Sequence, residues 1–316
     1  MRKFSWLLLL LLSACSDRHI EPMVFGAVTW PGYEPAYIAR ELGLLEEDRV
    51  HLAEFTNSTE VLRAFRNGQM HVAALTLDEA LELRRSVPDL QIFLVTDFSN
   101  GADLLMVRHG ISKLGQLRGK RIGVEKTALG AYYLSLILQE ARLDSSSVNI
   151  ISLPLDEHVR AFREGRVDAV VTFAPVEGKL KQEGAEILFD SSKVPGKIVD
   201  TLVVRASVID EQRTHLRYFI KAWFKGLEAM EHDREFAYPF IAKREQMSVA
   251  QVATTLGGLR LADRQTNIEQ LNGNPPMLLK TGMDIQHILE SSKLATGSDD
   301  LLHLINPALF QEAGLD

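Results

Sequence analysis

One pattern of apolar and polar positions occurs twice along this chain. Residues 59–68 (TEVLRAFRNG) align with residues 156–165 (DEHVRAFREG) at an offset of 97 residues, with six identical positions. Each copy predicts a short helix that buries one phenylalanine, starts at Thr59, Asp156 or a neighbouring N-cap, and ends at Gly68 or Gly165. An internal repeat of this length indicates two structurally similar halves.

Short apolar runs flank both copies of the helix and predict β-strands. The offset pairs Val24–Val28 with Arg121–Glu125, Val50–Phe55 with Ser147–Ser152, and His71–Leu75 with Asp168–Thr172. Each half is then expected to run strand, loop, helix, strand, helix, strand. This alternation favours parallel sheets covered by helices, so we predict an α/β fold with two similar lobes.

Two more extended runs, 103–108 and 200–205, each begin with aspartate and end with arginine. We expect them to be hinge strands that cross between the lobes. The second lobe (109–200) would then be inserted into the first (23–108 and 201–316). After residue 207 the apolar positions recur every three or four residues, which predicts C-terminal helices packed on the first lobe. The predicted buried face consists of Leu216, Phe219, Ile220, Trp223, Phe224 and Leu227.

The first residues predict an exported protein. A basic pair at 2–3, an apolar run at 4–12 and small residues before Cys15 form a signal peptide over 1–14 that resembles the lipobox of bacterial lipoproteins. Cleavage before Cys15 and acylation there would hold the chain to a membrane through a tether at 15–22. An ordinary secretory signal with an incidental cysteine is the alternative. We expect the periplasmic side of a bacterial membrane, with the choice of inner or outer membrane open.

Composition narrows the functional classes. The net charge is −7 with no concentrated basic stretch, which argues against nucleic acid as a partner. Cys15 is the only cysteine, so an internal disulfide is excluded. The chain has no Walker A loop, no His-Glu-x-x-His and no Gly-x-Ser-x-Gly, so we expect that it is not an enzyme and has no cofactor or metal. We also expect a monomer.

Four ordered motifs carry a resemblance to a known family. They are Thr29-Trp30-Pro31-Gly32-Tyr33, Leu42-Gly43-Leu44, Leu117-Arg118-Gly119-Lys120-Arg121-Ile122-Gly123-Val124 and Gly165-Arg166-Val167-Asp168-Ala169. Over residues 23–240 the chain resembles the periplasmic substrate-binding proteins of the sulfonate, taurine, nitrate and thiamine-precursor type. This resemblance implies a type II periplasmic binding protein fold, a small-molecule solute held between two lobes, and delivery of that solute to an ABC-type permease.

Ligands of open α/β sheets bind beyond the carboxyl ends of the strands, so the loops there supply the candidate site. Aromatic faces, backbone at a glycine, helix N-termini and carboxylates are the groups these loops offer. The candidate ligand-binding residues are Trp30, Gly32, Tyr33, Asn57, Ser58, Thr59, Thr76, Asp78, Asp97, Asn100, Glu125, Thr127, Asp156, Thr172 and Phe173. For Asn57, Thr59, Asp78 and Asp156, helix capping is an equally simple explanation, and Trp30 and Tyr33 are alternatively partly buried aromatics.

The predicted loops hold several carboxylates and one clear cation, Lys126. Carboxylates repel anions, so we favour a cationic amine or a neutral heteroaromatic solute, such as a thiamine precursor, over a sulfonate, taurine or nitrate. A second function stays open. A tethered two-lobe protein could instead report its solute to a membrane sensor kinase or a cyclic-nucleotide enzyme, because lobe closure changes its surface either way.

Overall fold

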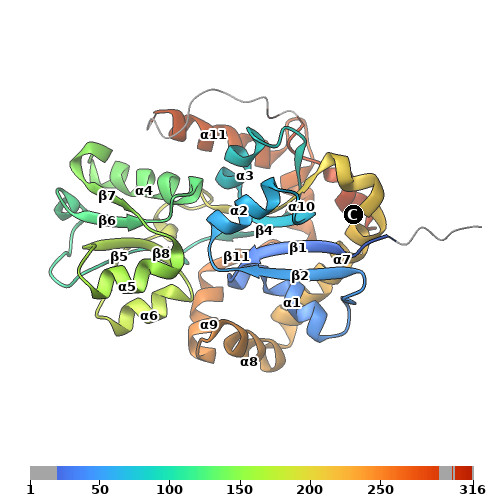
Figure 1. Ribbon diagram of the computed structural model, residues 1–316, viewed down its shortest axis with the longest axis horizontal. Helices are drawn as coiled ribbons and strands as arrows, with labels where there is room; N and C mark the ends of the chain where they lie inside the picture. The colour runs from blue at the N-terminus through green and yellow to red at the C-terminus, as the bar shows by residue number, and fades with distance from the viewer. Residues whose placement is uncertain (1–19, 292–300, 302, 315–316) are drawn as a thin grey trace, which may run out of the picture.

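The computed structural model describes residues 20–291, 301 and 303–314. The predicted signal peptide and Cys15 lie outside these described residues. The chain forms two α/β lobes side by side, each built around one sheet (Figure 1).

The first sheet has the strand order β11-β4-β10-β3-β1-β2. Strands β1, β2 and β3 are mutually parallel, β10 runs antiparallel between β3 and β4, and β11 pairs antiparallel with β4. Their bounds are β1 Met23–Val28, β2 Val50–Phe55, β3 Val72–Thr76, β4 Leu90–Ser99, β10 Val199–Arg205 and β11 Leu259–Leu261.

The second sheet has the order β7-β6-β8-β5-β9. Strands β6, β7 and β8 are parallel, and β5 runs antiparallel between β8 and β9. The bounds are β5 Asp103–Val107, β6 Arg121–Val124, β7 Asn149–Ser152, β8 Ala169–Phe173 and β9 Glu186–Asp190. The six strands predicted from the repeat therefore all exist, within a residue or two of their predicted ends.

Helices cover both sheets. We call the first sheet with its helices lobe 1, and the second sheet with its helices lobe 2. The α-helices of lobe 1 are α1 Glu34–Glu41, α2 Ser58–Arg66, α3 Leu77–Arg84, α7 Ala206–His232, α8 Arg234–Glu245, α9 Val249–Gly257, α10 Arg264–Leu271, α11 Met277–Ser291 and α12 Pro307–Glu312. Those of lobe 2 are α4 Ala128–Ala141, α5 His158–Arg163 and α6 Val176–Gln182. Short 3-10 turns include η1 (Pro31–Tyr33), η3 (Ser145–Ser147) and η4 (Leu155–Glu157).

The internal repeat extends to hydrogen-bond register. Phe25 pairs with Val72 across β1 and β3, and the residues 97 positions later, Ile122 and Ala169, pair across β6 and β8. The helix-ending glycines Gly68 and Gly165 both have φ of 71°, the left-handed conformation that glycine adopts at no steric cost. The two lobes therefore share one backbone frame.

The crossover strands correct one boundary. We assigned residues 103–108 to lobe 1 and 109–200 to lobe 2, but β5 pairs with β8 and β9 in lobe 2, and β10 pairs in lobe 1 from Val199 onward. Each crossover strand therefore belongs to the sheet of the lobe that it enters, not of the lobe that it leaves. An extended apolar run shows that a strand forms, but it does not specify which sheet edge supplies the hydrogen bonds.

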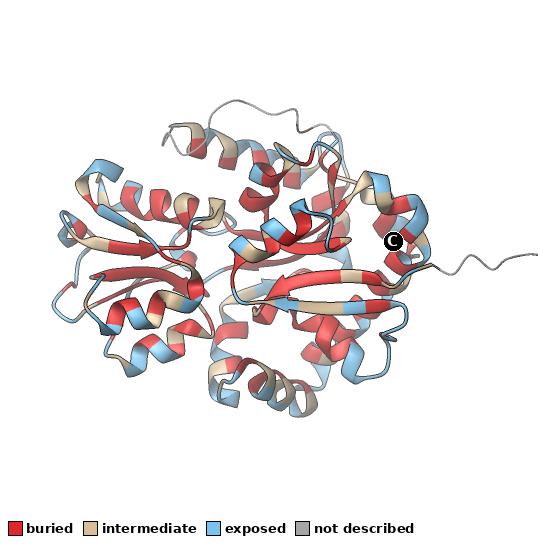
Figure 2. Cartoon of the chain, in the orientation of Figure 1, coloured by how far each residue is buried: buried red, intermediate tan, exposed pale blue. Residues whose placement is uncertain are grey.

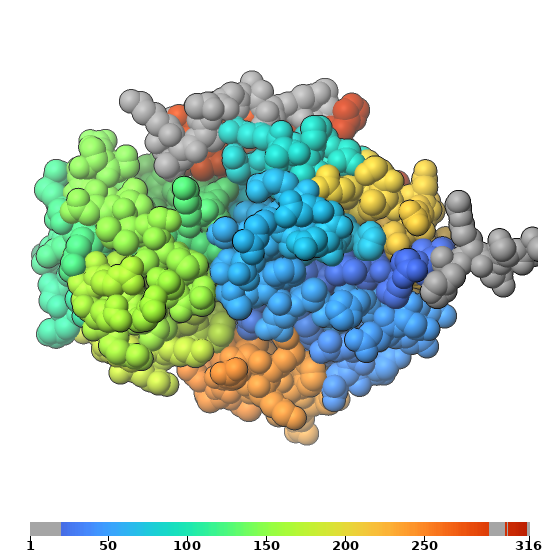
Figure 3. Space-filling model, viewed as in Figure 1, coloured from blue at the N-terminus to red at the C-terminus, as the bar shows by residue number. Residues whose placement is uncertain are grey.

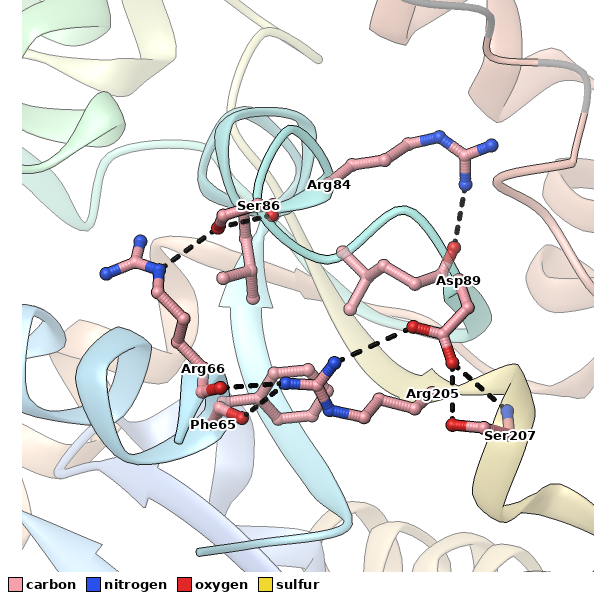
Figure 4. Close-up of polar contacts among 9 residues, drawn as sticks. Phe65, Arg66, Arg84, Ser86, Asp89, Arg205 and Ser207 are labelled. Carbon is pink, nitrogen blue, oxygen red and sulfur yellow. Dashed lines mark hydrogen bonds and ion pairs between the residues drawn. The ribbon is translucent and has the colours of Figure 1, made fainter. Parts of the chain in front are cut away.

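The arginine that ends each crossover strand locks the repeated helix of the lobe it joins. Arg205 lies over the Phe65 ring at 5.2 Å, and Arg108 lies over the Phe162 ring at 4.2 Å. Figure 4 shows the Arg205 arrangement, in which Nη2 donates to the carbonyl oxygens of Phe65 and Arg66 at 3.0 Å each. Arg205 thereby gives the Arg66 carbonyl at the C-terminal end of α2 a donor and adds one to the Phe65 carbonyl, which also accepts from Gly68 N–H at 3.0 Å.

The predicted apolar face of the C-terminal helices is confirmed in α7, where all six residues are buried. Phe219 and Trp223 pack against Phe25 of β1, with ring centroids 5.1 and 6.4 Å apart. The inner strands of both sheets are largely buried, while the edge strands β2, β7, β9 and β11 and the outer helix faces are partly exposed (Figure 2). Within the described ranges, no helix is both long enough and apolar enough to cross a bilayer.

Candidate functional site

A small cavity lies between the lobes. Its volume is about 20 Å³, room for roughly one water molecule. Residues from both lobes line it: Val28, Trp30, Tyr33, Ser58, Thr76, Glu79, Asp103, Leu129, Phe173 and Asp200. The cavity therefore lies beyond the carboxyl ends of the parallel strands, where ligands of α/β sheets bind.

Two of its carboxylates come from equivalent places in the repeat. Asp103 starts β5 opposite Phe173, and Asp200, 97 residues later in the chain, lies opposite Thr76 in β10. Asp103 is 4% exposed and Asp200 is 3% exposed. The symmetry of the two crossover strands thus brings one buried carboxylate from each lobe to the cavity.

Burial governs the protonation of these acids. It raises the pKa of Asp103 to about 6. Burial, with the nearby charges of Asp78 and Glu125, raises the pKa of Glu79 to about 8. Burial and the neighbouring Asp97 raise the pKa of Asp200 well above its usual value, and Asp200 accepts a hydrogen bond from the Tyr33 hydroxyl. Removing several carboxylates from water favours their neutral forms unless a cation compensates.

Two polar atoms on the cavity lining lack partners. Glu79 accepts through Oε2 from the backbone N–H of Thr76 at 3.3 Å, but its Oε1 has no hydrogen-bond partner. Thr76 Oγ1 is also buried without a partner. Buried polar groups in native proteins are almost always hydrogen-bonded, so a bound molecule with hydrogen-bonding groups would satisfy this site.

The loop after β1 is shaped by Asp97. Trp30 is 4% exposed, meets the Phe173 ring edge-on at 5.3 Å, and directs Nε1 toward Asp97 Oδ2 at 3.4 Å. A Cβ on Gly32 would lie 2.1 Å from that same Oδ2. Gly32 therefore permits Asp97 to approach the backbone of η1, and Asp97 orients Trp30 from behind the cavity.

Four predicted residues form contacts between the lobes. Asn57 caps α2 through Oδ1, which accepts from Glu60 N–H at 3.0 Å, and its Nδ2 donates to Asp156 Oδ1 at 3.3 Å. Glu125 Oε1 accepts from Thr59 N–H at 3.1 Å and from Thr59 Oγ1 at 3.3 Å. Asn57 is thus both a helix cap and a link between the lobes, whereas α5 has no side-chain cap from Asp156.

The remaining predicted residues lie away from the cavity lining. Asp78 is fully buried in α3, and burial raises its pKa to about 7. Asn100 is exposed between β4 and β5, and Thr127 caps α4 by accepting from Gly130 N–H at 3.3 Å. The Thr172 hydroxyl lies 3.4 Å from His158 Nδ1, on the side of β8 that faces α5. Side chains alternate across a strand, so Thr172 and Phe173 point in opposite directions.

Sequence reasoning left five lining residues out of its candidate set. These are Val28, Glu79, Asp103, Leu129 and Asp200. A signal for the two aspartates was present, because each begins a crossover strand at the same position of the repeat. Glu79 directly follows a predicted residue, Asp78, and the geometry of the first helical turn decides which of the two faces the cavity.

A larger cavity of about 650 Å³ lies on lobe 2, between α4, β7 and η3. Its walls are mainly apolar, and its lining includes Glu125, Lys126 and Thr127. Lys126, the cation predicted near the cleft, is exposed here and does not line the cavity between the lobes. Of the side chains that the structure describes, no three His, Cys, Asp or Glu form a group able to hold a metal ion.

Two α/β lobes, two crossover strands and a cavity between them define the fold of periplasmic binding proteins. The chain belongs to the NMT1-like family, whose model matches residues 18–241. It is 25% identical over 196 residues to the taurine-binding periplasmic protein of Escherichia coli (strain K12), a match that covers 60% of this chain and 61% of that relative. The chain thus spans less than two thirds of the length of this curated relative.

Solved structures show the same fold. The alkanesulfonate-binding protein SsuA from Xanthomonas axonopodis pv. citri, bound to MOPS, has a TM-score of 0.74 at 17% identity, covering 88% of this chain and 96% of that chain. The periplasmic nitrate-binding protein NrtA from Synechocystis PCC 6803 has a TM-score of 0.76 at 9% identity, covering 93% of this chain and 88% of that chain. These relatives are named for the solutes that they bind.

Proposed function

We propose that this chain is a lipid-anchored substrate-binding protein of an ABC-type importer, which closes two lobes on a small cationic amine or a neutral, hydrogen-bonding heteroaromatic solute. One observation carries the solute class. The cavity lining holds the carboxyl groups of Glu79, Asp103 and Asp200, and none of its residues is lysine or arginine. An anion there would be repelled by the charged form of Asp103, with no lysine or arginine on the lining to compensate it.

The protonation states support the same class. At neutral pH Asp103 is mostly charged and Glu79 mostly protonated, given pKa values of about 6 and about 8. Their surroundings then supply both a negative charge and neutral hydrogen-bonding groups. Binding of a cation should weaken as the pH falls through 6, because Asp103 then takes up a proton and loses its attraction for the ligand.

A thermal-shift screen at neutral pH tests the solute class. Amines, pyrimidines, amino acids, sulfonates and nitrate are compared, because a ligand of the native state raises the unfolding midpoint by mass action. We expect an amine or pyrimidine to stabilise the protein. Stabilisation by a sulfonate or nitrate alone would show that the carboxylates do not set the selectivity.

Variants then locate the binding site by calorimetry. Asp103→Asn should weaken a cationic ligand at least tenfold, the size of one lost charge-assisted hydrogen bond. Asp168→Asn is the matched control, because Asp168 pairs with Arg121 at 2.7 Å on lobe 2 and does not line the cavity. Equal losses in the two variants would exclude Asp103 as a direct ligand.

The anchor and the permease have separate tests. Cys15→Ser should abolish lipid labelling and release the protein from membranes, and unchanged processing would contradict the proposed lipidation. If a permease gene lies beside the gene for this chain, reconstitution with that permease should show ATP hydrolysis stimulated by the loaded protein. If a neighbouring sensor kinase responds to the loaded protein instead, the chain reports its solute and does not deliver it.

A further inference from the structure

The N-terminal end of α2 already holds a carboxylate of the chain itself. Ser58, the first residue of α2, lines the cavity, and the next residue, Thr59, receives Glu125 from lobe 2. The first N–H groups of a helix are unpaired and carry partial positive charge, so this end of a helix favours an anion. Glu125 is 7% exposed and occupies that position.

The backbone around Glu125 is held firmly. A Cβ on Gly130 would lie 2.2 Å from the Glu125 carbonyl oxygen, so the first turn of α4 packs directly on this residue. Thr127 caps the same turn. The link between Asn57 and Asp156 forms a second contact between the N-terminal end of α2 and lobe 2. On the face drawn in Figure 3, blue atoms of lobe 1 lie against green atoms of lobe 2.

We propose that Glu125 is a built-in anion that latches the two lobes together and excludes external anions from the α2 N-terminus. Glu125 is then a specificity residue that acts without touching the solute, since it does not line the cavity between the lobes. This role rests on the proposed function for its biological meaning, although the latch is measurable with no solute present.

The hydrogen bonds between Glu125 and Thr59 are strong enough to favour the closed arrangement of the lobes. Hydrogen bonds to a charged acceptor are stronger than neutral ones, and here one carboxylate oxygen accepts two of them across the interface between the lobes. Loss of this contact should shift the equilibrium between closed and open lobes by roughly tenfold toward the open form. A shift of this size converts a mostly closed population into a visibly mixed one.

The first test measures lobe separation in the full-length chain without solute. With Cys15 replaced by serine, spin labels are placed on cysteines introduced at Gln69 of lobe 1 and Lys179 of lobe 2, both exposed, and distances are measured by double electron–electron resonance. Glu125→Ala and Glu125→Gln should add a longer distance, and Glu125→Asp should retain more of the closed distance because it keeps the charge. Glu140→Gln, an exposed acid on α4, is the matched control.

The second test uses taurine and inorganic sulfate as anion probes in calorimetry. The wild-type chain should bind neither, and Glu125→Gln should gain at least tenfold in affinity for one of them. Unchanged distances in all three Glu125 variants, or wild-type binding of either anion as tight as in Glu125→Gln, would overturn the latch. If Glu125→Ala fails to fold, Thr59→Ala removes one partner of the same contact and should give a smaller shift in distance.

The two proposals fail separately. A solute screen without any hit would leave the measured latch in place and remove the transport function. A clear amine ligand, with Glu125 variants that behave like Glu140→Gln, would retain the transport function and remove the latch.

Discussion

Lobes 1 and 2 have the same strand arrangement but present different residues to the cleft between them. Both have three parallel strands in the same order, one antiparallel crossover strand, and an arginine over the phenylalanine of the repeated helix. The residues at the carboxyl ends of the parallel strands differ between the lobes. Lobe 1 offers a capped helix terminus at Asn57, whereas the counterpart in lobe 2 is a 3-10 turn that carries Asp156. The shared frame positions the loops, and the loop residues decide which group each lobe presents to the cleft.

The side chains and helices that pack on the two sheets differ as well. In each lobe a side chain just before the third strand accepts a hydrogen bond from the first strand. His71 Nδ1 accepts from Val24 N–H, and Asp168 Oδ2 accepts from Arg121 N–H, both at 2.9 Å. Lobe 1 additionally receives α7, which has no counterpart in the repeat. The same backbone contact is therefore made by different chemistry, and the lobes should respond differently to pH and to mutation.

The largest difference between the lobes should be in the pH dependence of stability, and it should come from His158. The counterpart of His158, 97 residues earlier, is the buried Val61. Burial lowers the pKa of His158 to about 4. Between pH 6.5 and 4 the unfolded state binds this proton and the native state does not, so stability falls as the pH falls, by about 3 kcal/mol in total. Urea titrations of His158→Val should lose this share of the pH dependence.

His158→Gln is the control for this test, since it removes the titration but keeps polar atoms near Thr172. Buried carboxylates with raised pKa values oppose the histidine, so the difference between variant and wild type is the quantity to measure. A difference that stays constant from pH 7 to pH 4 would contradict a neutral buried His158.

The second prediction concerns the helix that only lobe 1 has. A Cβ on Gly226 of α7 would lie 2.0 Å from the Pro35 carbonyl oxygen, which belongs to backbone and cannot rotate away. Gly226→Ala should therefore separate α1 from α7 and reduce the free energy of unfolding by about 2 kcal/mol. Hydrogen exchange should show the loss of protection in the first sheet and much less in the second.

Gly257→Ala provides the comparison, because a Cβ there meets nothing within 4 Å. Its free energy of unfolding should be unchanged or slightly higher. Equal loss of protection in both sheets after Gly226→Ala would mean that the lobes unfold as one cooperative unit.

The smallest expected difference is between the losses of stability caused by replacing Arg205 and by replacing Arg108. Arg205 donates to two carbonyl oxygens of α2, while Arg108 donates through Nε to one, that of Val167, at 3.0 Å. We expect Arg205→Ala to cost about 2 kcal/mol and Arg108→Ala about 1 kcal/mol, from lost hydrogen bonds and cation–π contact. Denaturant midpoints of Arg205→Ala and Arg108→Ala, compared with those of Arg205→Lys and Arg108→Lys, show which arginine contributes more to stability. The reverse order would indicate that ring contact matters more than capping.

The repeat made much of the fold predictable. Phe65 and Phe162, the glycines that end their helices and the strands around them follow local rules of burial and turn geometry, which act over a few residues. The face of Thr172 and the sheet that β5 joins were mispredicted, because each depends on which neighbour the strand meets. Asp103 and Asp200 were visible as equivalent positions, yet their convergence required the pairing of β5 with β8 and of β10 with β3.

By itself, the sequence determined two similar α/β halves, the amphipathic face of α7 and a set of polar loops at the strand ends. Periodicity and turn chemistry are local, so they can be recovered from the order of residues. Only the tertiary structure decided that Glu79, Asp103 and Asp200 share one cavity and that Glu125 reaches Thr59, 66 residues away in the chain. These contacts arise when the lobes pack together, and no local pattern encodes the distance between two lobes.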